Sequence, residues 1–425
     1  MLAEVGVLTH RQGLGAHAID RRRKRVTCIM WWLAVVASGL TALTILTAVF
    51  PQPFGLLLGA IALLGVLVWA DGWMREEGAV PILTYHSVSA NAKWLPWAAE
   101  ISVNPEVFER HLQTLRSHGV AVMRTSDLIE ARRRGAPLPQ RAAVIHLDDG
   151  YLDNWVAAVP LLRRFAMPAT MFVSLDFIEP QGPIRPTFDD PSAADGRSLE
   201  WEGYANWTEL EAIAREGLVD IQSHGLDHGR VEVSAEIVDR VSMANWRQLA
   251  WVQWRSMTGP KCDWFRSIEP PSVPVGTLVR RSDGAFAARA WSPAHVESER
   301  EFDERVRSHL RICRQVLSRK LSGVPTVFCW PQNLRCQRAV EIAYEEGYHA
   351  TTGGKGENRR EEDPRILSRV HIGEQAGGRP WLEAMAFLAT VRTFQGNLYW
   401  YFPLFLFHAF RWLRGWTGRL QRAVP

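Results

Sequence analysis

The chain has 425 residues, of which 47% are hydrophobic and 22% charged, so it can form one large folded domain with additional segments at its ends. Its formal net charge is only +4, and the excess of Lys and Arg lies in residues 1–78 and 379–425. This distribution argues against nucleic acid as a partner and favours contact of both ends with anionic membrane lipid. The five cysteines are scattered and predict no disulfide framework, which fits a reducing compartment.

The first 78 residues predict a membrane anchor. Residues 26–70 carry no charge, and Pro51 and Pro53 divide them into apolar runs at 26–50 and 54–70. Each run is close to the roughly 20 residues that a membrane-spanning helix needs, whereas the whole is too long for one helix. We therefore predict a transmembrane helical hairpin.

The basic residues 21–25 place the N-terminus in the cytoplasm by the positive-inside rule. A complete hairpin would then return the following domain to the cytoplasmic face of a bacterial inner membrane, which is the arrangement we expect. If the second run only lies in the membrane interface, that domain is outside the cytoplasm.

Residues 79–376 predict an α/β domain. Apolar, strand-like runs alternate with amphipathic helical patterns, which predicts a parallel sheet with outer helices, closed or nearly closed. The expected strands are 80–85, 143–147, 170–175, 219–223, 326–330 and 366–372, and the expected helices are 105–118, 125–134, 207–216 and 297–320. Two polar, irregular segments, 179–199 and 259–293, are either a roof over the site or surface insertions.

A pair of carboxylates follows the second expected strand. Asp148 and Asp149 come directly after its apolar residues, and Gly150 allows the chain to turn sharply. Both acids therefore stand at the carboxyl end of a core strand, where α/β folds place their chemistry. Two buried carboxylates side by side stay ionised only if a cation or strong donors offset their repulsion, and a metal ion is the simplest solution.

Metal ligands are available after the expected strand 219–223. His224 and His228 lie four residues apart, and imidazoles at this spacing face the same way on a helical turn, which suits zinc. The sequence therefore predicts a divalent metal site, with zinc as the expected ion.

These motifs resemble those of the NodB-homology polysaccharide deacetylases, carbohydrate esterase family four. His146-Leu147-Asp148-Asp149-Gly150 is similar to the family's Thr-Phe-Asp-Asp-Gly, and His224-Gly-Leu-Asp-His228 to its His-(Ser/Thr)-x-x-His. The resemblance implies a distorted (β/α) barrel of about seven strands. It also implies these roles: Asp148 as general base, Asp149, His224 and His228 as metal ligands, and His371 as general acid.

The first expected strand and helix are similar to the membrane-associated branch that deacetylates poly-N-acetylglucosamine. Pro81-Ile-Leu-Thr-Tyr85-His86 resembles its first strand, and the sequence from Asn104 resembles its first helix. This resemblance places Tyr85 and His86 beside the substrate, although a buried hydrogen-bonded pair is an equal alternative.

The family's third motif is altered in this chain. The family has an Arg that holds the base, followed by Pro, an aromatic residue and Gly, whereas this chain has Cys329 at the Arg position and Asn333 at the Gly position. Asn adopts left-handed conformations more readily than other non-Gly residues, so Asn333 is compatible with the motif. The resemblance places Trp330 and Pro331 beside the substrate and gives the backbone N–H of Gln332 a part in stabilising an oxyanion.

The last segment, 377–425, predicts a helix in the membrane interface. It is rich in aromatic residues between 394 and 416, and the Arg residues that follow have no acidic partner nearby. Aromatic residues with Arg are typical of a membrane interface, and Pro403 disfavours a full span.

Together these features predict a membrane-anchored, metal-dependent amidohydrolase that removes an N-acetyl or N-formyl group from an amino sugar carried on a membrane lipid. Two alternatives remain open. One is an extracytoplasmic deacetylase of poly-N-acetylglucosamine. The other is an inactive metal- and carbohydrate-binding protein, for which Cys329 in place of Arg is the reason.

Overall fold

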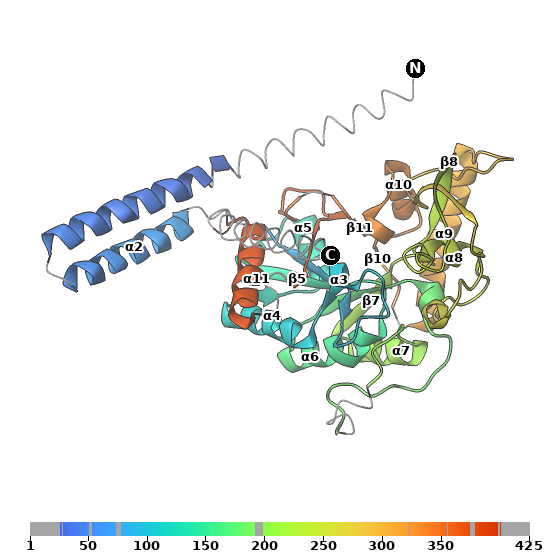
Figure 1. Cartoon of the computed structure of the whole chain (residues 1–425), viewed down its shortest axis with the longest axis horizontal. Coiled ribbons are helices and arrows are strands. Elements are labelled where there is room, and N and C mark those ends of the chain that lie inside the picture. Colours follow the sequence, from blue (N-terminus) through green and yellow to red (C-terminus); the bar gives the residue numbers. More distant parts are fainter. Residues whose placement is uncertain are drawn as a thin grey trace, which may run out of the picture. The chain divides into compact units, whose positions relative to one another are not determined.

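A computed structural model describes residues 26–27, 29–50, 53–73, 78–191, 199–321, 323–354, 356–374, 379–397 and 400 (Figure 1). The chain divides into two compact units, of which the larger is Val80–Glu374. The smaller contains Met1–Ala79 together with Gln375–Pro425.

The larger unit is a nearly closed barrel of parallel strands. Around the sheet the order is β12-β11-β10-β7-β6-β5-β1-β13, and β4 pairs with β5 outside this path. The strands are β1 Ile82–Tyr85, β4 Ala121–Val122, β5 Ala142–Leu147, β6 Ala169–Val173, β7 Val219–Ser223, β10 Val327–Phe328, β11 Ala350–Thr352, β12 Ile366–Leu367 and β13 Arg369–His371.

The two ends of this strand order are joined by one residue. β12 and β13 stand at opposite edges of the sheet, yet only Ser368 separates them in the chain, so the sheet must curve round on itself. If β12 and β13 count as one interrupted strand, the barrel has seven strand positions, which confirms the predicted fold class.

Asn358 closes the gap at this junction. Its side-chain NH₂ donates to the carbonyls of Val80 (2.9 Å) and Ser368 (2.7 Å), and its side-chain oxygen accepts from the Ser368 N–H (2.8 Å). Asn358 is 1% exposed and has φ of 57°, a left-handed conformation that Asn tolerates better than most residues. One side chain therefore pairs backbone groups that no neighbouring strand reaches.

The strands and outer helices follow the sequence pattern closely. Every residue of β5 and β6 is buried, as expected for strands covered on both faces. The predicted helices appear as α4 Pro105–Ser117, α5 Thr125–Arg134, α7 Trp207–Glu216 and α9 Glu299–Lys320, and two further outer helices are α6 Val159–Phe165 and α10 Gln337–Glu345.

Local signals fix the helix ends. The Asn104 side chain accepts a hydrogen bond from the Glu106 N–H at the start of α4, with Pro105 in the first turn. Ser298 and Glu301 form a capping box at the start of α9.

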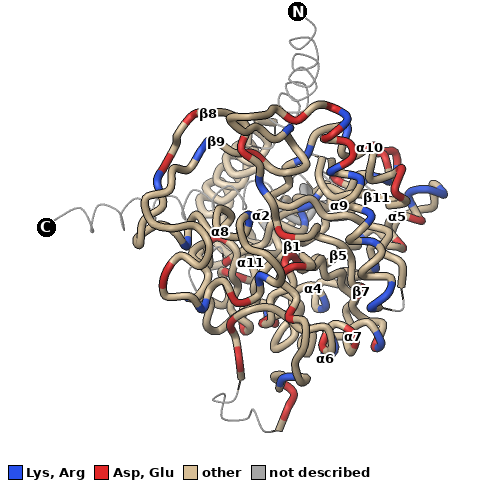
Figure 2. The backbone as a smooth tube through the Cα atoms, turned by 90° about the vertical axis from the view of Figure 1, so that its right-hand side faces the viewer, with Lys and Arg blue, Asp and Glu red and all other residues tan. Residues whose placement is uncertain are grey.

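Charged residues of both signs occur together on the outer helices, for example on α9 and α10 (Figure 2). Between α9 and α10, Arg338 pairs with Asp303 at 2.6 Å, and Arg307 pairs with Glu346 at 2.9 Å. These exposed pairs each contribute little to stability, about 0–1 kcal/mol, but they keep this face free of a single-sign patch.

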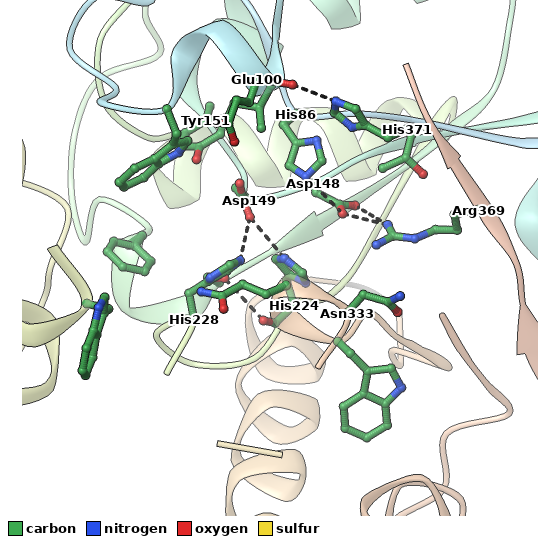
Figure 3. Close-up of a pocket in the computed structure, with 18 of the residues that line it drawn as sticks. His86, Glu100, Asp148, Asp149, Tyr151, His224, His228, Asn333, Arg369 and His371 are labelled. Carbon is green, nitrogen blue, oxygen red and sulfur yellow. Dashed lines mark hydrogen bonds and ion pairs between the residues drawn. The ribbon is translucent and has the colours of Figure 1, made fainter. Parts of the chain in front are cut away.

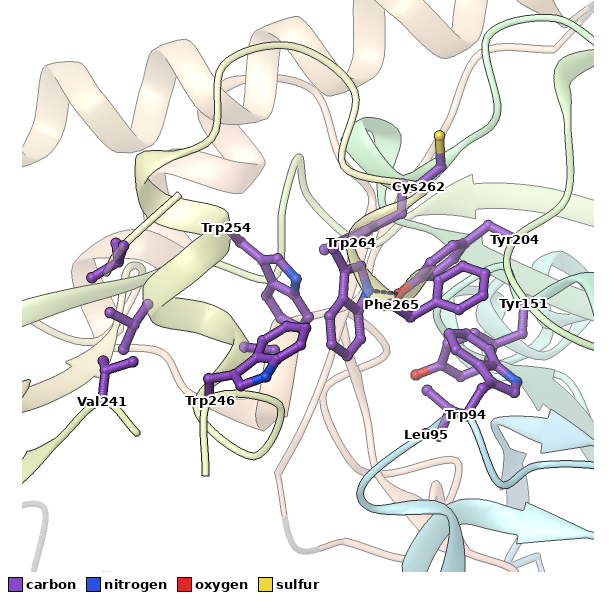
Figure 4. Close-up of a cluster of buried hydrophobic side chains, with 14 of the residues drawn as sticks. Trp94, Leu95, Tyr151, Tyr204, Val241, Trp246, Trp254, Cys262, Trp264 and Phe265 are labelled. Atoms are coloured by element: carbon purple, nitrogen blue, oxygen red, sulfur yellow. Dashed lines mark hydrogen bonds between the residues drawn. The ribbon is translucent and has the colours of Figure 1, made fainter. Parts of the chain in front are cut away.

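The segment between β7 and β10 is an ordered insertion. It contains an antiparallel hairpin, β8 Arg230–Arg240 and β9 Leu278–Gly284, and the helix α8 Ala250–Ser256. The irregular part predicted at 259–293 packs into an aromatic core that includes Trp246, Trp254, Trp264 and Phe265 (Figure 4). The Trp264 indole N–H donates to the Tyr204 hydroxyl at 3.0 Å.

The other segment predicted to be irregular, 179–199, is held by a buried arginine. The Arg185 guanidinium donates to both carboxylate oxygens of Glu209 at 2.8 Å and lies 3.0 Å from Glu179. Residues 192–198 of this segment lie outside the described residues.

Three short elements lie near the amino end of the larger unit. They are β2 Ser87–Val88, which pairs with β3 Ser102–Val103, and α3 Ala98–Ile101 between them.

Two N-terminal helices belong to the described part of the smaller unit. The first, Ile29–Val49, is long and apolar enough to cross a membrane by length and composition, and α2 Phe54–Trp73 follows it. A Cβ atom placed on Gly39 would meet Leu63 Cδ1 at 2.6 Å, so the helices approach closely at this glycine. The two helices form the predicted hairpin, while its crossing of a membrane stays a prediction.

Toward the C-terminus, the smaller unit has the helix α11 Pro380–Phe394. The aromatic and basic stretch predicted to lie in the membrane interface falls mostly on residues 401–425, outside the described residues.

Candidate active site

The Asp-Asp-Gly turn begins where β5 ends. The Asp148 N–H donates to the Tyr85 carbonyl of β1 at 2.9 Å, which continues the strand pairing. Asp149 and Gly150 then both adopt positive φ, 75° and 73°. A Cβ on Gly150 would lie 3.0 Å from Val173 Cγ1, so Gly suits this position for both its φ and its space. The strained turn brings both carboxylates into one pocket (Figure 3).

Asp149 and the two predicted imidazoles converge. Asp149 Oδ1 lies 3.1 Å from His224 Nε2 and 3.4 Å from His228 Nε2, and the three ligand atoms lie within 4.8 Å of one another. The other ring nitrogen of His224, Nδ1, donates to the Cys329 carbonyl at 2.9 Å, which directs Nε2 toward Asp149. His228 reaches the site through a left-handed backbone with φ of 58°.

These three residues fit a divalent metal. Asp149 Oδ1 is buried and makes no hydrogen bond, although two imidazole nitrogens face it. Burial alone would raise the pKa of Asp149, but His224 and His228 hold it well below its usual value, so the carboxylate is ionised. One carboxylate and two imidazoles are a common donor set for zinc, and a cation among them would satisfy the unpaired oxygen.

A second group of possible ligands, Asp148, His224 and Cys329, also lies within 4.8 Å. Its carboxylate is already engaged, because both oxygens of Asp148 contact Arg369 and Oδ2 also accepts from the Cys329 thiol at 3.6 Å. The first group is therefore the better candidate metal centre.

Arg369 holds the carboxylate of Asp148. Its Nη1 lies 2.8 Å from Oδ1 and 2.7 Å from Oδ2, and Asp148 is 1% exposed. Burial alone would raise the pKa of Asp148, but the Arg369 guanidinium outweighs burial and lowers it to about 2. His224 and His86 contribute to this lowering.

Arg369 was not among the predicted site residues, although its spacing from His371 was a signal. Arg369 and His371 lie two residues apart on one strand, so their side chains point to the same face. Cys329, at the position where the family has its Arg, is instead fully buried after β10. The guanidinium that the third motif lacks thus reaches the same carboxylate from β13, on the far side of β1.

The structure brings His371 and His86 together near the carboxylates. Their ring centroids lie 5.2 Å apart, and His371 Nε2 donates to the Glu100 carbonyl at 2.9 Å. His86 Nε2 lies 3.8 Å from Asp148 Oδ2, and burial lowers the pKa of His86 to about 4 despite the nearby carboxylates.

Two residues predicted to lie beside the substrate do not line the pocket. Tyr85 is 1% exposed, and its hydroxyl pairs with His111 Nδ1 at 3.1 Å, so it is buried as the alternative expected, but its partner is His111 and not His86, which lines the pocket. Pro331 is buried as well, whereas Trp330, Gln332 and Asn333 do line the pocket. Gln332 and Asn333 both have positive φ, 53° and 57°.

The pocket above these groups has a volume of about 540 Å³ and one aromatic wall. The wall residues are Trp97, Tyr151, Phe177, Tyr204, Trp251 and Trp254. Several of these side chains also belong to the aromatic core shown in Figure 4. The same cluster therefore packs the core and lines the pocket.

Comparison with known proteins is consistent with this site. Residues 135–267 match the family model described as polysaccharide deacetylase. The chain is 22% identical over 273 residues to the poly-beta-1,6-N-acetyl-D-glucosamine N-deacetylase of Escherichia coli strain K12, which covers 63% of this chain and 34% of that protein. The chain thus spans about a third of that relative's length.

A putative polysaccharide deacetylase of Bacillus subtilis, YxkH, is 24% identical over 160 residues, which is 37% of this chain and 47% of that protein. Among solved structures, a de-N-acetylase from Aggregatibacter actinomycetemcomitans is 18% identical with a TM-score of 0.49, covering 69% of this chain and 95% of that one. The matched residues 135–267 contain both aspartates and both imidazoles of the site, so this part of the chain is similar to the polysaccharide deacetylase family in the residues that form the candidate active site.

Proposed function

We propose that this chain is a metal-dependent amidohydrolase that removes the N-acetyl group from an N-acetylglucosamine unit. The observation that carries the proposal is an ionised, arginine-held carboxylate, Asp148, beside the ligand group of Asp149, His224 and His228. A base next to a metal centre with open positions is the arrangement that amide hydrolysis needs.

When bound, a zinc-like ion supplies Lewis-acid polarisation of the amide carbonyl and lowers the pKa of water. Asp148 is ionised and accepts a proton from the attacking water, and Arg369 keeps its carboxylate in place. The backbone N–H of Gln332, at the edge of the pocket, is available to the developing oxyanion. His371 then protonates the leaving amine, while its contact with Glu100 fixes the ring.

Polar atoms without partners support a sugar as the ligand. Pocket residues with such buried atoms are Thr84 (Oγ1), His86 (Nδ1), Trp254 (Nε1) and Trp330 (Nε1). Buried polar atoms without hydrogen bonds are uncommon, and sugar hydroxyls would satisfy them. The aromatic wall adds the flat apolar surface on which a pyranose ring packs.

The inactive binding protein is the weaker alternative. Its reason was Cys329 in the place of an arginine, and Arg369 supplies that guanidinium to Asp148 from another strand. A protein that only binds sugar would not need base, metal ligands and acid in one pocket.

Two glycans are candidate substrates, one linked to a lipid and the other a polymer. The helix Ile29–Val49 supports a membrane anchor, and a second span through α2 would give the cytoplasmic orientation and the lipid-linked substrate that the sequence predicts. The similarity to a poly-beta-1,6-N-acetyl-D-glucosamine N-deacetylase favours a second candidate, a polymer deacetylated outside the cytoplasm.

The test uses the full chain, purified in detergent and loaded with zinc. Acetate release is measured from β-1,6-linked N-acetylglucosamine oligomers and from lipid extracts of cells that lack the protein. Release only from lipid, with a product that is lighter than its precursor by one acetyl group in mass spectrometry, supports the lipid-linked substrate. Release only from oligomers supports the polymer, and release from neither rejects the proposed function.

Orientation is tested in intact cells with an impermeant thiol reagent. Ile184 is 54% exposed, so Ile184→Cys in a Cys28→Ser, Cys336→Ser background provides an accessible thiol, because the other three cysteines, Cys262, Cys313 and Cys329, are buried. Protection of this thiol until the membrane is permeabilised is expected for a cytoplasmic domain. Ready labelling in intact cells would reject that orientation.

A further inference from the structure

The loop that carries both imidazoles, residues 224–228, has a backbone that needs external support. Gly225 has φ of 92° and His228 has φ of 58°, so left-handed conformations occur at both sides of the loop. A non-Gly residue in this region is strained and persists only where the surrounding structure fixes it. The contacts that fix this loop therefore determine where the two imidazoles lie.

A buried lysine from the insertion contacts this loop. Lys261 Nζ lies 2.7 Å from Asp227 Oδ2, and Asp227 stands directly before His228. The same ammonium lies 3.0 Å from Asp176 Oδ2, in the segment after β6, and the Lys261 side chain is only 6% exposed. Lys261 thus joins the loop to the end of the neighbouring barrel strand.

Backbone hydrogen bonds run parallel to this ion-pair contact. The Lys261 N–H donates to the Asp176 carbonyl at 2.6 Å, and the Asp176 N–H donates to the Leu226 carbonyl at 2.8 Å. The Leu175 N–H donates to the Gly225 carbonyl at 3.1 Å. Three segments, around 175–176, 225–227 and 261, are therefore held together by backbone hydrogen bonds as well as by the Lys261 side chain.

A histidine from α9 supports the loop as well. His309 Nε2 accepts the Leu226 N–H at 2.7 Å, and the His309 ring packs edge-on against Phe286. Burial lowers the pKa of His309 to about 4, so the ring is neutral, and the contact with the Leu226 N–H requires the tautomer in which Nε2 is the acceptor. The loop is thus anchored at Leu226 and at Asp227, the two residues that lie between Gly225 and His228.

We propose that Lys261 is a positioning residue that fixes His228 relative to His224 through Asp227 and thereby sets the affinity of the site for its metal ion. The proposal rests on the metal site of the proposed function and adds a role for the insertion between β7 and β10. Cys262, Trp264 and Phe265, directly after Lys261, belong to the aromatic core that forms the pocket wall. The insertion therefore supports the metal loop and the sugar-facing wall with one segment.

The test measures the zinc dissociation constant of the full chain by competition with a chelator of known affinity. Lys261→Met removes the ammonium and keeps an unbranched side chain of similar length. The zinc dissociation constant should therefore rise by about tenfold to hundredfold, as it does when residues that orient metal ligands are removed. Lys261→Arg restores a cation and should lie within a few-fold of wild type. Lys93→Met replaces an exposed lysine and should bind zinc as wild type does.

Asp176→Asn provides a second variant in case Lys261→Met does not fold, as judged by circular dichroism. Asp176 is 34% exposed on its side chain, and Lys261 keeps Asp227 as a partner, so a smaller rise in the dissociation constant is expected. At saturating zinc, kcat of Lys261→Met should recover toward wild type, because the catalytic groups are intact.

The outcomes separate this inference from the proposed function. Wild-type chain that binds no zinc and shows no turnover rejects the proposed function. Wild-type chain that binds zinc, with Lys261→Met and Asp176→Asn folded and binding it equally well, rejects only the role of Lys261. A lower unfolding temperature of the metal-free variants with unchanged zinc affinity would show that Lys261 is merely structural.

Discussion

Arg369 and Asp148, 221 residues apart in the chain, form a buried pair in which one guanidinium nitrogen contacts both carboxylate oxygens at 2.8 and 2.7 Å. The pair exists because only β1 lies between β5 and β13, and the long Arg369 side chain, whose backbone is level with Ile82 and Val144, reaches the carboxylate that follows the end of β5. Truncating Arg369 would leave Asp148 buried without its cation, which links this contact to the ionisation and the orientation of the base.

Arg369→Met should lower kcat/KM on the order of a hundredfold, because misplacing a catalytic group by about 1 Å has an effect of that size. Arg369→Lys keeps a cation and should lower kcat/KM less.

Burial raises the pKa of Asp148 and the Arg369 cation lowers it to about 2, so removing the cation lets this pKa rise. The base acts only when ionised, and the acid limb of the pH profile should therefore move to higher pH in Arg369→Met. Arg360→Met, on the exposed surface, is the matched control, and an unshifted acid limb would contradict the prediction.

The zinc content of purified variants should distinguish a metal ligand from the catalytic base. His224→Ala removes a ligand and should bind little zinc after dialysis, with activity lost in step. Asp148→Asn should keep close to the wild-type zinc content while kcat falls by about 10²–10⁴, since the amide cannot accept the proton. Metal analysis of both purified variants decides this. Loss of zinc from Asp148→Asn would instead make Asp148 a ligand.

The general acid can be identified by changing the leaving group. His371→Gln should lower kcat for the N-acetyl substrate by about 10²–10⁴ but have far less effect on an aryl acetate ester, whose leaving group needs no proton. His86→Gln should affect both substrates alike, because His86 faces Asp148. If His86→Gln rather than His371→Gln shows the amide-specific loss, the acid is His86.

Trp254→Phe keeps an aromatic ring in the pocket wall but removes an indole N–H that has no partner. If this N–H binds a sugar hydroxyl, KM should rise about threefold to tenfold, because a hydrogen bond contributes about 0.5–1.5 kcal/mol. Trp291→Phe, outside the pocket, is the control. Equal KM values for the two variants would assign Trp254 to packing alone.

Asn358→Ala should destabilise the barrel, because three hydrogen bonds across the β12–β13 junction are lost and backbone groups are left unpaired. At about 1 kcal/mol each, the free energy of unfolding should fall by about 2–4 kcal/mol. Urea denaturation of the zinc-free chain measures this change. Asn91→Ala, an exposed asparagine, should change stability by less than about 0.5 kcal/mol.

Local sequence determined the parts of the site that depend on a strand and the turn after it. The apolar run before Asp148, the glycine at 150 and the His224–His228 spacing were enough to predict a metal site at the carboxyl ends of two strands. The long amphipathic helices were equally predictable, because their apolar periodicity and caps are local signals. Short or exposed elements such as β11 and the β8–β9 hairpin lack such a signal and were missed.

Only the tertiary structure decided which distant residues meet the predicted ones. Arg369 reaches Asp148 and Lys261 reaches Asp227 because the strand order and the insertion bring them there, and no spacing in the sequence encodes these contacts. The same holds for Tyr85. The residues on either side of it in the chain, Thr84 and His86, line the pocket, while the Tyr85 side chain points into the core toward His111. A side chain's partner depends on how separate segments pack, whereas the sequence pattern within one segment specifies only its own backbone and the face that it buries.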